Sequence, residues 1–567
     1  MESKIRIMSY TILVAVIILI LRILFINSAG MYEYWTRHDI PNKNLMFRHN
    51  IVDRNGNILA ISVPAYEFHI NPAFIIDINA VIIKIRDIFP ELDEAKLYER
   101  LKGESNGWFL IKDNITPIQK KKIIEKGIEG AFFREYYTRF YPYGNTFSHI
   151  VGHTSKINAN EEGVKGLEKH FNQALLKQEV QLSLDAMVQS IVRENLLKTL
   201  EKFEAKGAMA IIVDLETREI IASVSLPDFN PNGKYEPNSP SYVNQPFSSV
   251  FNLGSVFKVF TISLGLQNGF KPTQIMHLPL SIPVNKDFSV KDDHRSRDEM
   301  TLEEILAFSS NVGVAFVVQK VGFEKQRQFY EDIKMFERPI IEMPKGEIAK
   351  PIFKKGKWRD DMHYTLSYGY GVSVSPAHFI AMAGGLAYDG KITNLTTLKG
   401  GNDVKKNREK QVLSNQNILD LQQMLRSVVQ IGTARRATIN GYSVCGKTGT
   451  SEKYDPAIRG WSDRKKFLSF FSVFPCHIPK YAMYIALDEP STSNAAFLQA
   501  SNTVVQTSSD IIKVVAPILD IKPDNLPEVI AEAVPVDTLV QESPNAENSQ
   551  TTQQTLAPVV DKSAAMQ

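Results

Sequence analysis

The first hydrophobic feature of the chain is an apolar run at residues 7–26, IMSYTILVAVIILILRILFI, in which Arg22 is the only charge. About twenty such residues can form a helix that crosses a bilayer core of roughly 30 Å. The alternative is a cleaved signal peptide, but the run is long and no clear small-residue cleavage site follows it. Because Lys4 and Arg6 precede the run, we predict a retained transmembrane helix with residues 1–6 in the cytoplasm.

The pattern changes after this predicted helix. Between residues 27 and 180, strand-like runs such as AYEFHINPAF alternate with turn signals such as DRNGN at 53–57 and with charged helical segments around 86–128. The alternation predicts a separate module of strands and helices, and the predicted orientation of the transmembrane helix places this module outside the cytoplasm.

Residues 181–523 combine long helical candidates with apolar strand-like runs, which predicts a mixed α/β or α+β domain. The predicted helices cover 186–203, 254–267, 302–321 and 418–429. The strand-like runs are GAMAIIVDL, EIIASVSL, YSVCGKTGT, FLSFFSVF and YAMYIALD. Residues 524–567 are rich in Gln, Ser, Pro, Thr and Ala, and their acidic residues outnumber a single lysine. We therefore expect a disordered acidic tail there.

Composition narrows the class of protein. A chain of 567 residues is too long for one hydrophobic core, so we expect two or three domains. Apolar residues make up 44% and charged residues 22%, which are ordinary globular proportions. The net charge is only +3 and no block of Lys and Arg occurs, which argues against a protein that mainly binds nucleic acid.

The cysteines and histidines predict neither a disulfide scaffold nor a metal site. Cys445 and Cys476 are too few for a disulfide-rich fold. If the strand-like runs around them pair as antiparallel neighbours, a disulfide between them is an alternative. Register cannot be derived from sequence, however, so we expect two separate thiols. His149 and His153 have the i,i+4 spacing of a zinc helix, but Ile150 replaces the catalytic glutamate, and we expect structural histidines.

One charge interrupts the apolar stretch LGSVFKVFTISLGL at 253–266, namely Lys258, three residues after Ser255. A lysine among apolar neighbours either snorkels to water or takes a lowered pKa, because desolvation disfavours its charged form. Gly254 allows a tight turn that places Ser255 at a helix N-terminus with Lys258 on the same face. The pattern predicts a serine nucleophile with a lysine base, although S-x-x-K also occurs in a charged segment at 462–465.

Two later motifs strengthen this interpretation. SSN at 309–311 follows the predicted helix start TLEEIL, and KTGT at 447–450 lies in a strand-like run. S-x-x-K, S-x-N and K-T-G in this order are the signature of active-site-serine, penicillin-recognising enzymes. S-x-N recurs by chance in the tail as SPN at 543–545, so the prediction depends on the order, spacing and context of all three motifs.

The residue types of the three motifs fit acyl transfer through a serine ester. Ser255 would attack a carbonyl while a neutral Lys258 takes its proton. Ser309 can relay a proton between the lysine and the leaving amine, and Asn311 can hold a peptide group of the substrate. Lys447 would supply positive charge that lowers the pKa of its neighbours and attracts a substrate carboxylate.

The strand that follows Lys447 would bind the substrate. Thr448 and Thr450 can donate hydroxyl hydrogen bonds to the substrate carboxylate. Gly449 leaves room for a ligand to lie along the strand in the manner of an added β-strand. The backbone N–H groups of Ser255 and Thr450 would form the oxyanion hole.

Over nearly its whole length the sequence resembles the class B penicillin-binding proteins, in particular the FtsI-type septal branch. RHNIVDRNGNILA at 48–60 is similar to the first motif of the family's pedestal domain, with His49 and Asn50 at the usual glycine and variable positions. Leu253 and Cys445 depart from the family, in which proline and a small apolar residue are usual. The other similar segments are RFYPYGNTFSHIVGHT, GVKGLEKHFN, DDHRSRDEMTLEEILAFSSN, LSYGYGVSVSP and QIGTARRA.

The resemblance implies an α+β fold with an N-terminal transmembrane helix at 7–26, a pedestal or dimerisation domain at 27–180 and a transpeptidase domain at 181–523. In the last of these, helices would flank a five-stranded antiparallel sheet. The implied activity is a D,D-transpeptidase that cross-links peptidoglycan stem peptides of the septal wall without a cofactor or metal and is acylated by penicillin.

The resemblance also implies a location and partners. The protein would sit in the inner membrane with a periplasmic catalytic domain. Its partners would be stem peptides and lipid-linked precursor strands, β-lactam inhibitors, a lipid-linked-precursor polymerase of the shape, elongation and division family, and other divisome proteins. Nucleic acid is not expected.

Three alternatives share some of these features. An elongation-type transpeptidase differs from the septal type by cellular position. A serine β-lactamase or D,D-carboxypeptidase would hydrolyse the acyl-enzyme with water. A non-catalytic divisome scaffold would lack turnover, although all three motifs are intact.

Overall fold

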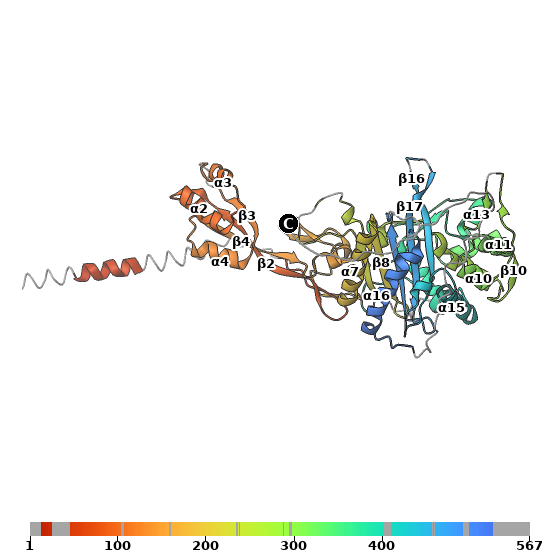
Figure 1. Ribbon diagram of the computed structural model, residues 1–567. Helices are drawn as coiled ribbons and strands as arrows, with labels where there is room; N and C mark the ends of the chain where they lie inside the picture. The colour runs from red at the N-terminus through yellow and green to blue at the C-terminus, as the bar shows by residue number, and fades with distance from the viewer. Residues whose placement is uncertain are drawn as a thin grey trace, which may run out of the picture. The chain divides into compact units, whose positions relative to one another are not determined.

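The computed structural model describes residues 13–24 and 46–524, apart from short gaps at 104–106, 158–159, 234–235, 237–238, 287, 294–296, 402–409, 456, 459 and 492–497. Figure 1 shows the described elements with their labels. The predicted cytoplasmic residues 1–6 lie outside the described residues. So does the predicted acidic tail, except for Asp524.

The predicted transmembrane helix is not supported by the described residues. They contain a helix at 13–24 whose side chains are all exposed. In the described ranges, no helix is both long and apolar enough to cross a membrane. The helix at 13–24 is shorter than the roughly 20 residues that a span needs, and residues 7–12 and 25–26 of the prediction lie outside the described ranges.

The part of the chain before residue 182 is built around a five-stranded sheet that the sequence analysis did not predict as such. Its order is β3-β2-β1-β7, with β4 also paired to β2. The long strands β2 and β4 pair from Ile61 opposite Phe140 to Ile70 opposite Ala131. Its strands are β1 (Ile51–Val52), β2 (Ile58–Ile70), β3 (Phe109–Ile115), β4 (Ala131–Phe140) and β7 (Val180–Gln181), and the same part of the chain also contains β5 (Thr154–Ile157) and β6 (Asn160–Gly163).

Short helices cover one end of this sheet and close a small hydrophobic core. Phe68 of β2 stacks on Phe133 of β4 with ring centroids 5.8 Å apart. Ile85 of the first covering helix, Phe89 directly after that helix and Ile123 of the third helix are buried against them. The helices of this region are α2 (Ile78–Ile88), α3 (Glu94–Leu101), α4 (Pro117–Glu125), α5 (Ser148–Val151) and α6 (Gly166–His170).

A second five-stranded sheet, in the order β16-β17-β18-β8-β9, has only antiparallel pairs. This result confirms the predicted five-stranded antiparallel sheet. Its strands are the five apolar runs recognised in the sequence, because continuous apolar runs suit strands that are buried on both faces. They are β8 (Gly207–Asp214), β9 (Ile220–Leu226), β16 (Cys445–Asp455), β17 (Gly460–Phe474) and β18 (Tyr481–Asp488).

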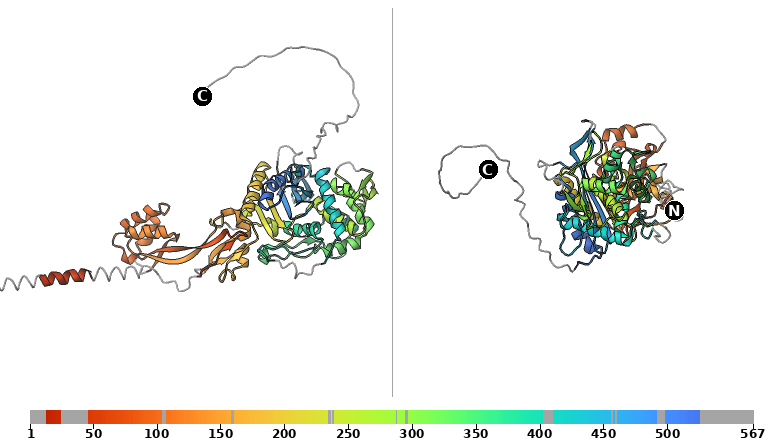
Figure 2. Two further views of the ribbon diagram at one scale, coloured as in Figure 1. Left: turned by 90° about the horizontal axis from the view of Figure 1, so that it is seen from below. Right: turned by 90° about the vertical axis from the view of Figure 1, so that its right-hand side faces the viewer.

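Helices lie on both faces of the second sheet (Figures 1 and 2). On one face, α7 and α16 are joined by a 2.8 Å hydrogen bond between Thr199 and Thr507. On the other, Phe379 of α14 contacts Phe471 and Tyr484. The helices are α7 (Ala186–Lys202), α8 (Gln245–Ser248), α9 (Lys258–Gln267), α10 (Leu302–Ala307), α11 (Asn311–Val321), α12 (Phe323–Asp332), α13 (Asp360–Ser367), α14 (Pro376–Tyr388), α15 (Asn415–Gln430) and α16 (Val504–Ile518).

The structure contains more β-sheets than the single five-stranded sheet that the sequence analysis predicted. Besides the two five-stranded sheets, the structure contains two-stranded sheets that are too short to produce a period-2 pattern. One of them joins β5 and β6. The others use β10 (Ile275–His277) with β13 (Glu299–Thr301), β11 (Ile282–Pro283) with β12 (Ser289–Val290), and β14 (Ile352–Phe353) with β15 (Val372–Ser373).

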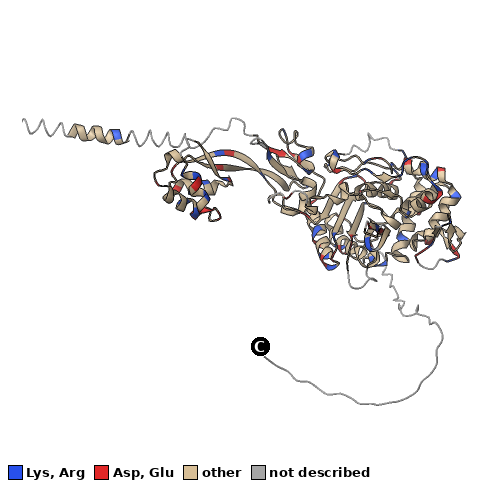
Figure 3. Ribbon diagram, turned by 90° about the horizontal axis from the view of Figure 1, so that it is seen from above, with Lys and Arg blue, Asp and Glu red and all other residues tan. Residues whose placement is uncertain are grey.

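Two predicted helices are interrupted in the structure. The helix expected at 302–321 divides into α10 and α11, because Ser310 caps α11 by accepting a hydrogen bond from Gly313 N. The helix expected at 254–267 begins as a 3-10 turn, Gly254–Phe257, before α9. Lys and Arg are interspersed with Asp and Glu over the described elements (Figure 3).

A buried ion cluster joins the segment RHNIVDRNGNILA at 48–60 to the segment around α6. Glu168 is fully buried and forms 2.6 Å ion pairs with Arg48 and with Arg139. Arg48 also donates to Asn172 Oδ1 at 2.6 Å. Since the two guanidinium groups are almost fully buried, the single carboxylate is needed to offset their desolvation.

We predict that Glu168→Gln destabilises the protein by about 3–5 kcal/mol, because it leaves two buried cations without a counter-charge. Thermal and denaturant unfolding of the variant measure the effect. The matched control is Glu194→Gln, which removes an exposed partner of Lys198 and should leave the unfolding midpoint unchanged. Equal midpoints for the two variants would contradict the role of the cluster.

Candidate active site

The S-x-x-K motif lies in a tight turn against the edge of the second sheet. Ser255 is half-buried in the 3-10 turn, and Lys258 is the first residue of α9. Residues i and i+3 of a 3-10 helix eclipse each other, so the two side chains share a face. Gly254 has φ +59°, and a Cβ there would lie 2.4 Å from the carbonyl oxygen of Thr450. Only glycine permits this approach of the turn to β16.

One hydroxyl joins the three predicted motifs. Ser309 Oγ accepts a hydrogen bond from Lys258 Nζ at 3.0 Å and another from Lys447 Nζ at 2.9 Å. Lys258 Nζ also donates to the backbone carbonyl of Ser309. In the described part of the chain, Ser255 Oγ makes no hydrogen bond. The structure therefore brings Lys258, Ser309 and Lys447 together, with Ser255 on the turn that leads into Lys258.

The two lysines are strongly desolvated. Both are completely buried. Burial lowers the pKa of Lys258 to about 8, and the carboxylates of Asp292 and Asp293 oppose part of this shift. Burial, and after it the charge of Lys258, hold the pKa of Lys447 well below its usual range. A neutral amine is therefore accessible near neutral pH, which is what a base for a serine hydroxyl requires.

The S-x-N motif is placed by a break between two helices. Ser309 lies between α10 and α11 with φ +63°, a left-handed conformation that non-glycine residues seldom adopt. Asn311 starts α11, and its Nδ2 donates to the carbonyl of Lys291 at 3.1 Å. Asp292 accepts hydrogen bonds from Ser310 Oγ at 2.8 Å and from Val312 N at 2.9 Å. The three residues that follow the strained Ser309 are thus tied to Lys291 and Asp292.

The K-T-G motif lies on β16, the edge strand of the second sheet. A Cβ on Gly449 would lie 2.8 Å from the Leu253 carbonyl, so this glycine is needed for contact with the serine turn. Thr450 is exposed. Thr448 is buried instead, and its hydroxyl lies 2.6 Å from that of Thr433. The substrate-binding role expected for Thr448 stays a prediction.

Comparison with known families identifies the chain. Residues 208–509, more than half of the sequence, match the penicillin-binding protein transpeptidase domain, and residues 47–179 match the penicillin-binding protein dimerisation domain. The chain belongs to the penicillin-binding proteins.

Curated relatives refine this assignment. The chain is 28% identical over 491 residues to the probable peptidoglycan D,D-transpeptidase FtsI of Caulobacter vibrioides, with 84% of this chain and 82% of the relative covered. It is 25% identical over 476 residues to the peptidoglycan D,D-transpeptidase FtsI of Escherichia coli, with 78% and 79% covered. The chain is a class B penicillin-binding protein of the FtsI type.

A solved structure supports the fold. The crystal structure of penicillin-binding protein 3 from Mycobacterium tuberculosis, complexed with aztreonam, superimposes with a TM-score of 0.65 at 21% identity. The match covers 85% of this chain and 98% of that one.

Sequence reasoning missed three residues of this penicillin-binding protein's site. Asp292 lies in a loop before β13 and begins DDHRSRDEMTLEEILAFSSN, a segment that the resemblance marked without assigning a role to Asp292. Thr433 belongs to QIGTARRA, which the resemblance marked without assigning a role. Tyr370 of the YGYG segment accepts a 3.3 Å hydrogen bond from Glu452 N, just beyond the K-T-G motif.

The two histidines considered as metal ligands make backbone contacts. His149 Nε2 bonds the carbonyl oxygen of Ser241 at 2.7 Å, and His153 Nδ1 lies 3.2 Å from that of Thr154. Burial lowers the pKa of His149 to about 4, so this histidine is neutral. The contacts agree with a structural role for both side chains.

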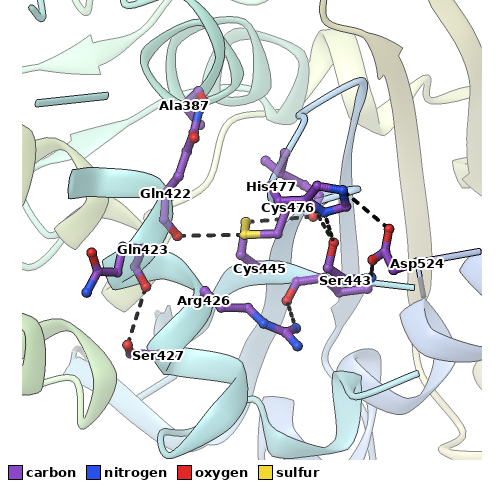
Figure 4. The surroundings of a disulfide bond; sticks show 12 residues. Ala387, Gln422, Gln423, Arg426, Ser427, Ser443, Cys445, Cys476, His477 and Asp524 are labelled. Atoms are coloured by element: carbon purple, nitrogen blue, oxygen red, sulfur yellow. Dashed lines mark hydrogen bonds and ion pairs between the residues drawn. A yellow bond between two sulfur atoms is a disulfide. The ribbon is translucent and has the colours of Figure 1, made fainter. Parts of the chain in front are cut away.

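The expectation of two separate thiols was wrong. Cys445 and Cys476 form a disulfide with a Cα separation of 5.3 Å. Figure 4 shows it between β16 and the segment that leaves β17, beside Gln422 and Arg426 of α15. The register of β16 against β17, which could not be derived from the sequence, places Cys445 opposite Val473. The Cys476 N–H donates to the Ser443 carbonyl at 2.9 Å. The bond ties down β16 two residues before Lys447.

We predict that the double variant Cys445→Ala/Cys476→Ala lowers the free energy of unfolding by about 3–4 kcal/mol, since the bond closes a loop of sequence separation 31. Equilibrium denaturation against the parent chain measures the loss. Cys445→Ala alone should lose nearly as much, because it already opens the loop. Alkylation of the unfolded, unreduced parent that labels two free thiols would contradict the bond.

Proposed function

We propose that this penicillin-binding protein is a septal peptidoglycan D,D-transpeptidase that works through an acyl-enzyme on Ser255. The observation that supports the proposal most directly is the Ser309 hydroxyl, which bonds two buried lysines beside the serine turn. The names of the curated FtsI relatives support the substrate, a stem peptide of peptidoglycan.

The first half-reaction would acylate Ser255. Neutral Lys258 takes the hydroxyl proton as Ser255 Oγ attacks the carbonyl of the terminal D-Ala-D-Ala bond. The C–N bond breaks, and the proton passes through Ser309 to the departing D-alanine amine. The N–H groups of Ser255 and Thr450 would stabilise the oxyanion. In the second half-reaction the amine of another stem peptide attacks the ester, loses a proton to the same base and releases Ser255.

Penicillin would follow only the first half of this path. Attack on its strained amide forms the same serine ester, but the leaving nitrogen stays attached to the product and blocks the acceptor. Penicillin therefore serves as a probe of acylation.

The remaining site residues bind substrate in this proposal. Asn311 would hold a peptide group, and Thr450 and Gly449 would line the groove along β16. Lys447 keeps Ser309 in place and shares its proton network. The complete burial of Lys447 favours this positioning of Ser309 over the role suggested by the motif alone, a fixed positive charge for the substrate carboxylate. Thr448 acts through Thr433 and supports the strand rather than the substrate.

The location of the protein is part of the proposal. The apolar run at 7–26 would anchor the chain in the inner membrane, with a pedestal domain at 27–180, the transpeptidase domain at 181–523 and a disordered acidic tail at 524–567. A disulfide beside the active strand suits the oxidising periplasm. The proposed partners are lipid-linked precursor strands, their polymerase and other divisome proteins.

Loss of the nucleophile tests the proposal. Ser255→Ala should take up no labelled penicillin, whereas Ser462→Ala should label like the parent. Ser462 is a matched control because it starts the second S-x-x-K sequence, where its Oγ accepts from the Lys465 amide and Lys465 Nζ pairs with Asp455 at 2.8 Å. Mass spectrometry of the labelled peptide locates the ester.

Two outcomes of the labelling experiment would overturn parts of the proposal. Labelling of Ser255→Ala would reject the nucleophile. Release of the label within seconds would indicate a β-lactamase or carboxypeptidase, because a transpeptidase leaves the penicilloyl ester waiting for an amine.

The pH dependence of acylation tests the base. Since Lys258 must be neutral to act and its pKa is lowered to about 8, the second-order rate constant should rise about tenfold per pH unit below pH 8 and level off above it. Lys258→Arg, which stays protonated, should lose on the order of 10²-fold or more. A flat profile in the parent, or a small loss in Lys258→Arg, would assign the base to another group.

A further inference from the structure

A cavity of about 400 Å³, open to solvent, lies at the start of α13. This volume falls in the range of small-molecule sites. Two cations, one carboxylate, one hydroxyl and two apolar side chains line it, namely Lys354, Arg359, Asp361, Thr365, Phe288 and Met362. The lining therefore offers charge-assisted hydrogen bonds together with apolar contact.

The α13 wall of the cavity leads directly to the serine turn. The Tyr370 N–H donates to the Thr365 carbonyl at 3.0 Å, which folds the chain after α13 back onto the helix. Gly369 touches the serine turn, since a Cβ on Gly369 would lie 2.2 Å from the Gly254 carbonyl oxygen. Thr365 is thus separated from the serine turn only by the YGYG segment.

The wall that carries Lys354 is tied to the same turn by short strands. Lys354 directly follows β14, which pairs with β15. Val374, directly after β15, exchanges backbone hydrogen bonds of 3.1 Å and 3.2 Å with Phe251, shortly before Ser255. Two walls of the cavity therefore connect to the serine turn, so the cavity borders the cleft in which an acyl donor would lie.

The two lining cations retain donors for a ligand. Arg359 Nη2 donates to Asp361 Oδ2 at 2.5 Å, but its side chain is 70% exposed, and Nε and Nη1 bond no described residue. Lys354 is exposed and has no ion-pair partner among the described residues. Both belong to the segment KPIFKKGKWR at 350–359, which has five cations and no acid. The local field therefore favours an anion.

The cationic segment is held in place by packing. Trp358, directly before Arg359, is only 5% exposed, and its Nε1 donates to the Lys354 carbonyl at 2.9 Å. The Trp358 ring lies 5.5 Å from that of Phe336. Arg327 Nη1 donates to the Gly356 carbonyl at 3.1 Å. The backbone that presents both cations is therefore ordered before a ligand binds, which lowers the entropic cost of binding.

We propose that this cavity binds a free carboxylate of the donor stem peptide, upstream of the D-Ala-D-Ala bond that Ser255 would open. The inference rests on the proposed function, which places a stem peptide in the adjoining cleft. Each residue of an extended peptide advances about 3.4 Å, so residues shortly before the D-Ala pair reach a cavity that borders the serine turn. Lys354 and Arg359 pair with the carboxylate, while Phe288 and Met362 contact the aliphatic part of the same residue.

Matched peptides test the recognition of charge. Trifluoroacetyl-L-Ala-γ-D-Glu-L-Lys(Nε-acetyl)-D-Ala-D-Ala has a free glutamate carboxylate upstream of the D-Ala pair. A second peptide carries D-isoglutamine instead, a neutral carboxamide of the same shape. A third keeps isoglutamine but replaces lysine by Nε-acetyl meso-diaminopimelate, which places a carboxylate one residue closer to the D-Ala pair.

Fluorine NMR titration of the full-length Ser255→Ala chain in detergent measures binding without acylation. At about 0.15 M salt, at least one carboxylate peptide should bind about tenfold more tightly than the neutral peptide, as expected for a charge-assisted hydrogen bond. The peptide that shows this preference identifies which of the two carboxylates occupies the cavity.

Variants in the same background assign the preference to the cavity. Lys354→Glu and Arg359→Ala should each reduce the tenfold preference to about twofold or less. Lys350→Glu is the matched control, because it reverses an exposed charge of the same segment outside the lining, and it should keep the preference. All three side chains are exposed, and the unfolding midpoint of each variant verifies that it is folded.

The proposal is overturned if neither carboxylate peptide binds saturably, or if the neutral peptide binds as tightly as both. Equal loss of the preference in Lys354→Glu and Lys350→Glu would also overturn it, because general attraction to a positive surface would then explain the binding. Labelling of the parent chain with penicillin tests the proposed function separately. Normal labelling without a carboxylate preference rejects only the cavity, whereas a preference that needs Lys354 supports the cavity even if Ser255 takes no label.

Discussion

The structure depends on the desolvation of two lysines around one serine hydroxyl. An ammonium group removed from water loses hydration that few protein contacts replace, so burial shifts the equilibrium toward the neutral amine. Lys258 and Lys447 are both completely buried, and Ser309 Oγ accepts a hydrogen bond from each. The free-energy cost of burying the two lysines must be offset by the packing of helices on both faces of the second sheet.

The neighbouring elements make that burial possible. Gly254 lets the serine turn approach the carbonyl of Thr450, and the break between α10 and α11 points Ser309 at both lysines. Asp292 holds this break from outside by bonding Ser310 and Val312. The site is therefore a junction of three chain segments, each held by its own backbone constraint, which keeps the reacting groups in position before substrate arrives.

One covalent and one ionic constraint hold chain segments together without taking part in the reaction. The Cys445–Cys476 disulfide restrains β16 just before Lys447. The cluster of Glu168 with Arg48 and Arg139 joins Arg48 to residues 91 and 120 positions further along the chain. Both are examples of long-range contacts that limit the freedom of the unfolded chain or fix a unique packing, rather than contributing to the chemistry.

Much of the fold could be predicted from local patterns. The five apolar runs of residues 207–488 became the five strands of the second sheet, and the helices at 186–203 and 418–429 were found within a few residues, because strand and helix periodicity are local properties. The order S-x-x-K, S-x-N and K-T-G indicated Ser255, Lys258, Ser309, Asn311 and Lys447, since the chemistry of serine acyl transfer restricts the residue types that can perform it.

Only the tertiary structure decided the rest. The disulfide required the register of β16 against β17, which a period-2 pattern leaves undetermined. The helix expected at 302–321 is broken at Ser309, whose hydroxyl bonds two lysines that lie 51 and 138 positions away in the sequence. The contact between the hydroxyl groups of Thr448 and Thr433 is likewise a tertiary contact that no local pattern predicts. Local sequence sets what each segment prefers, whereas contacts between distant segments decide which of those preferences the folded chain keeps.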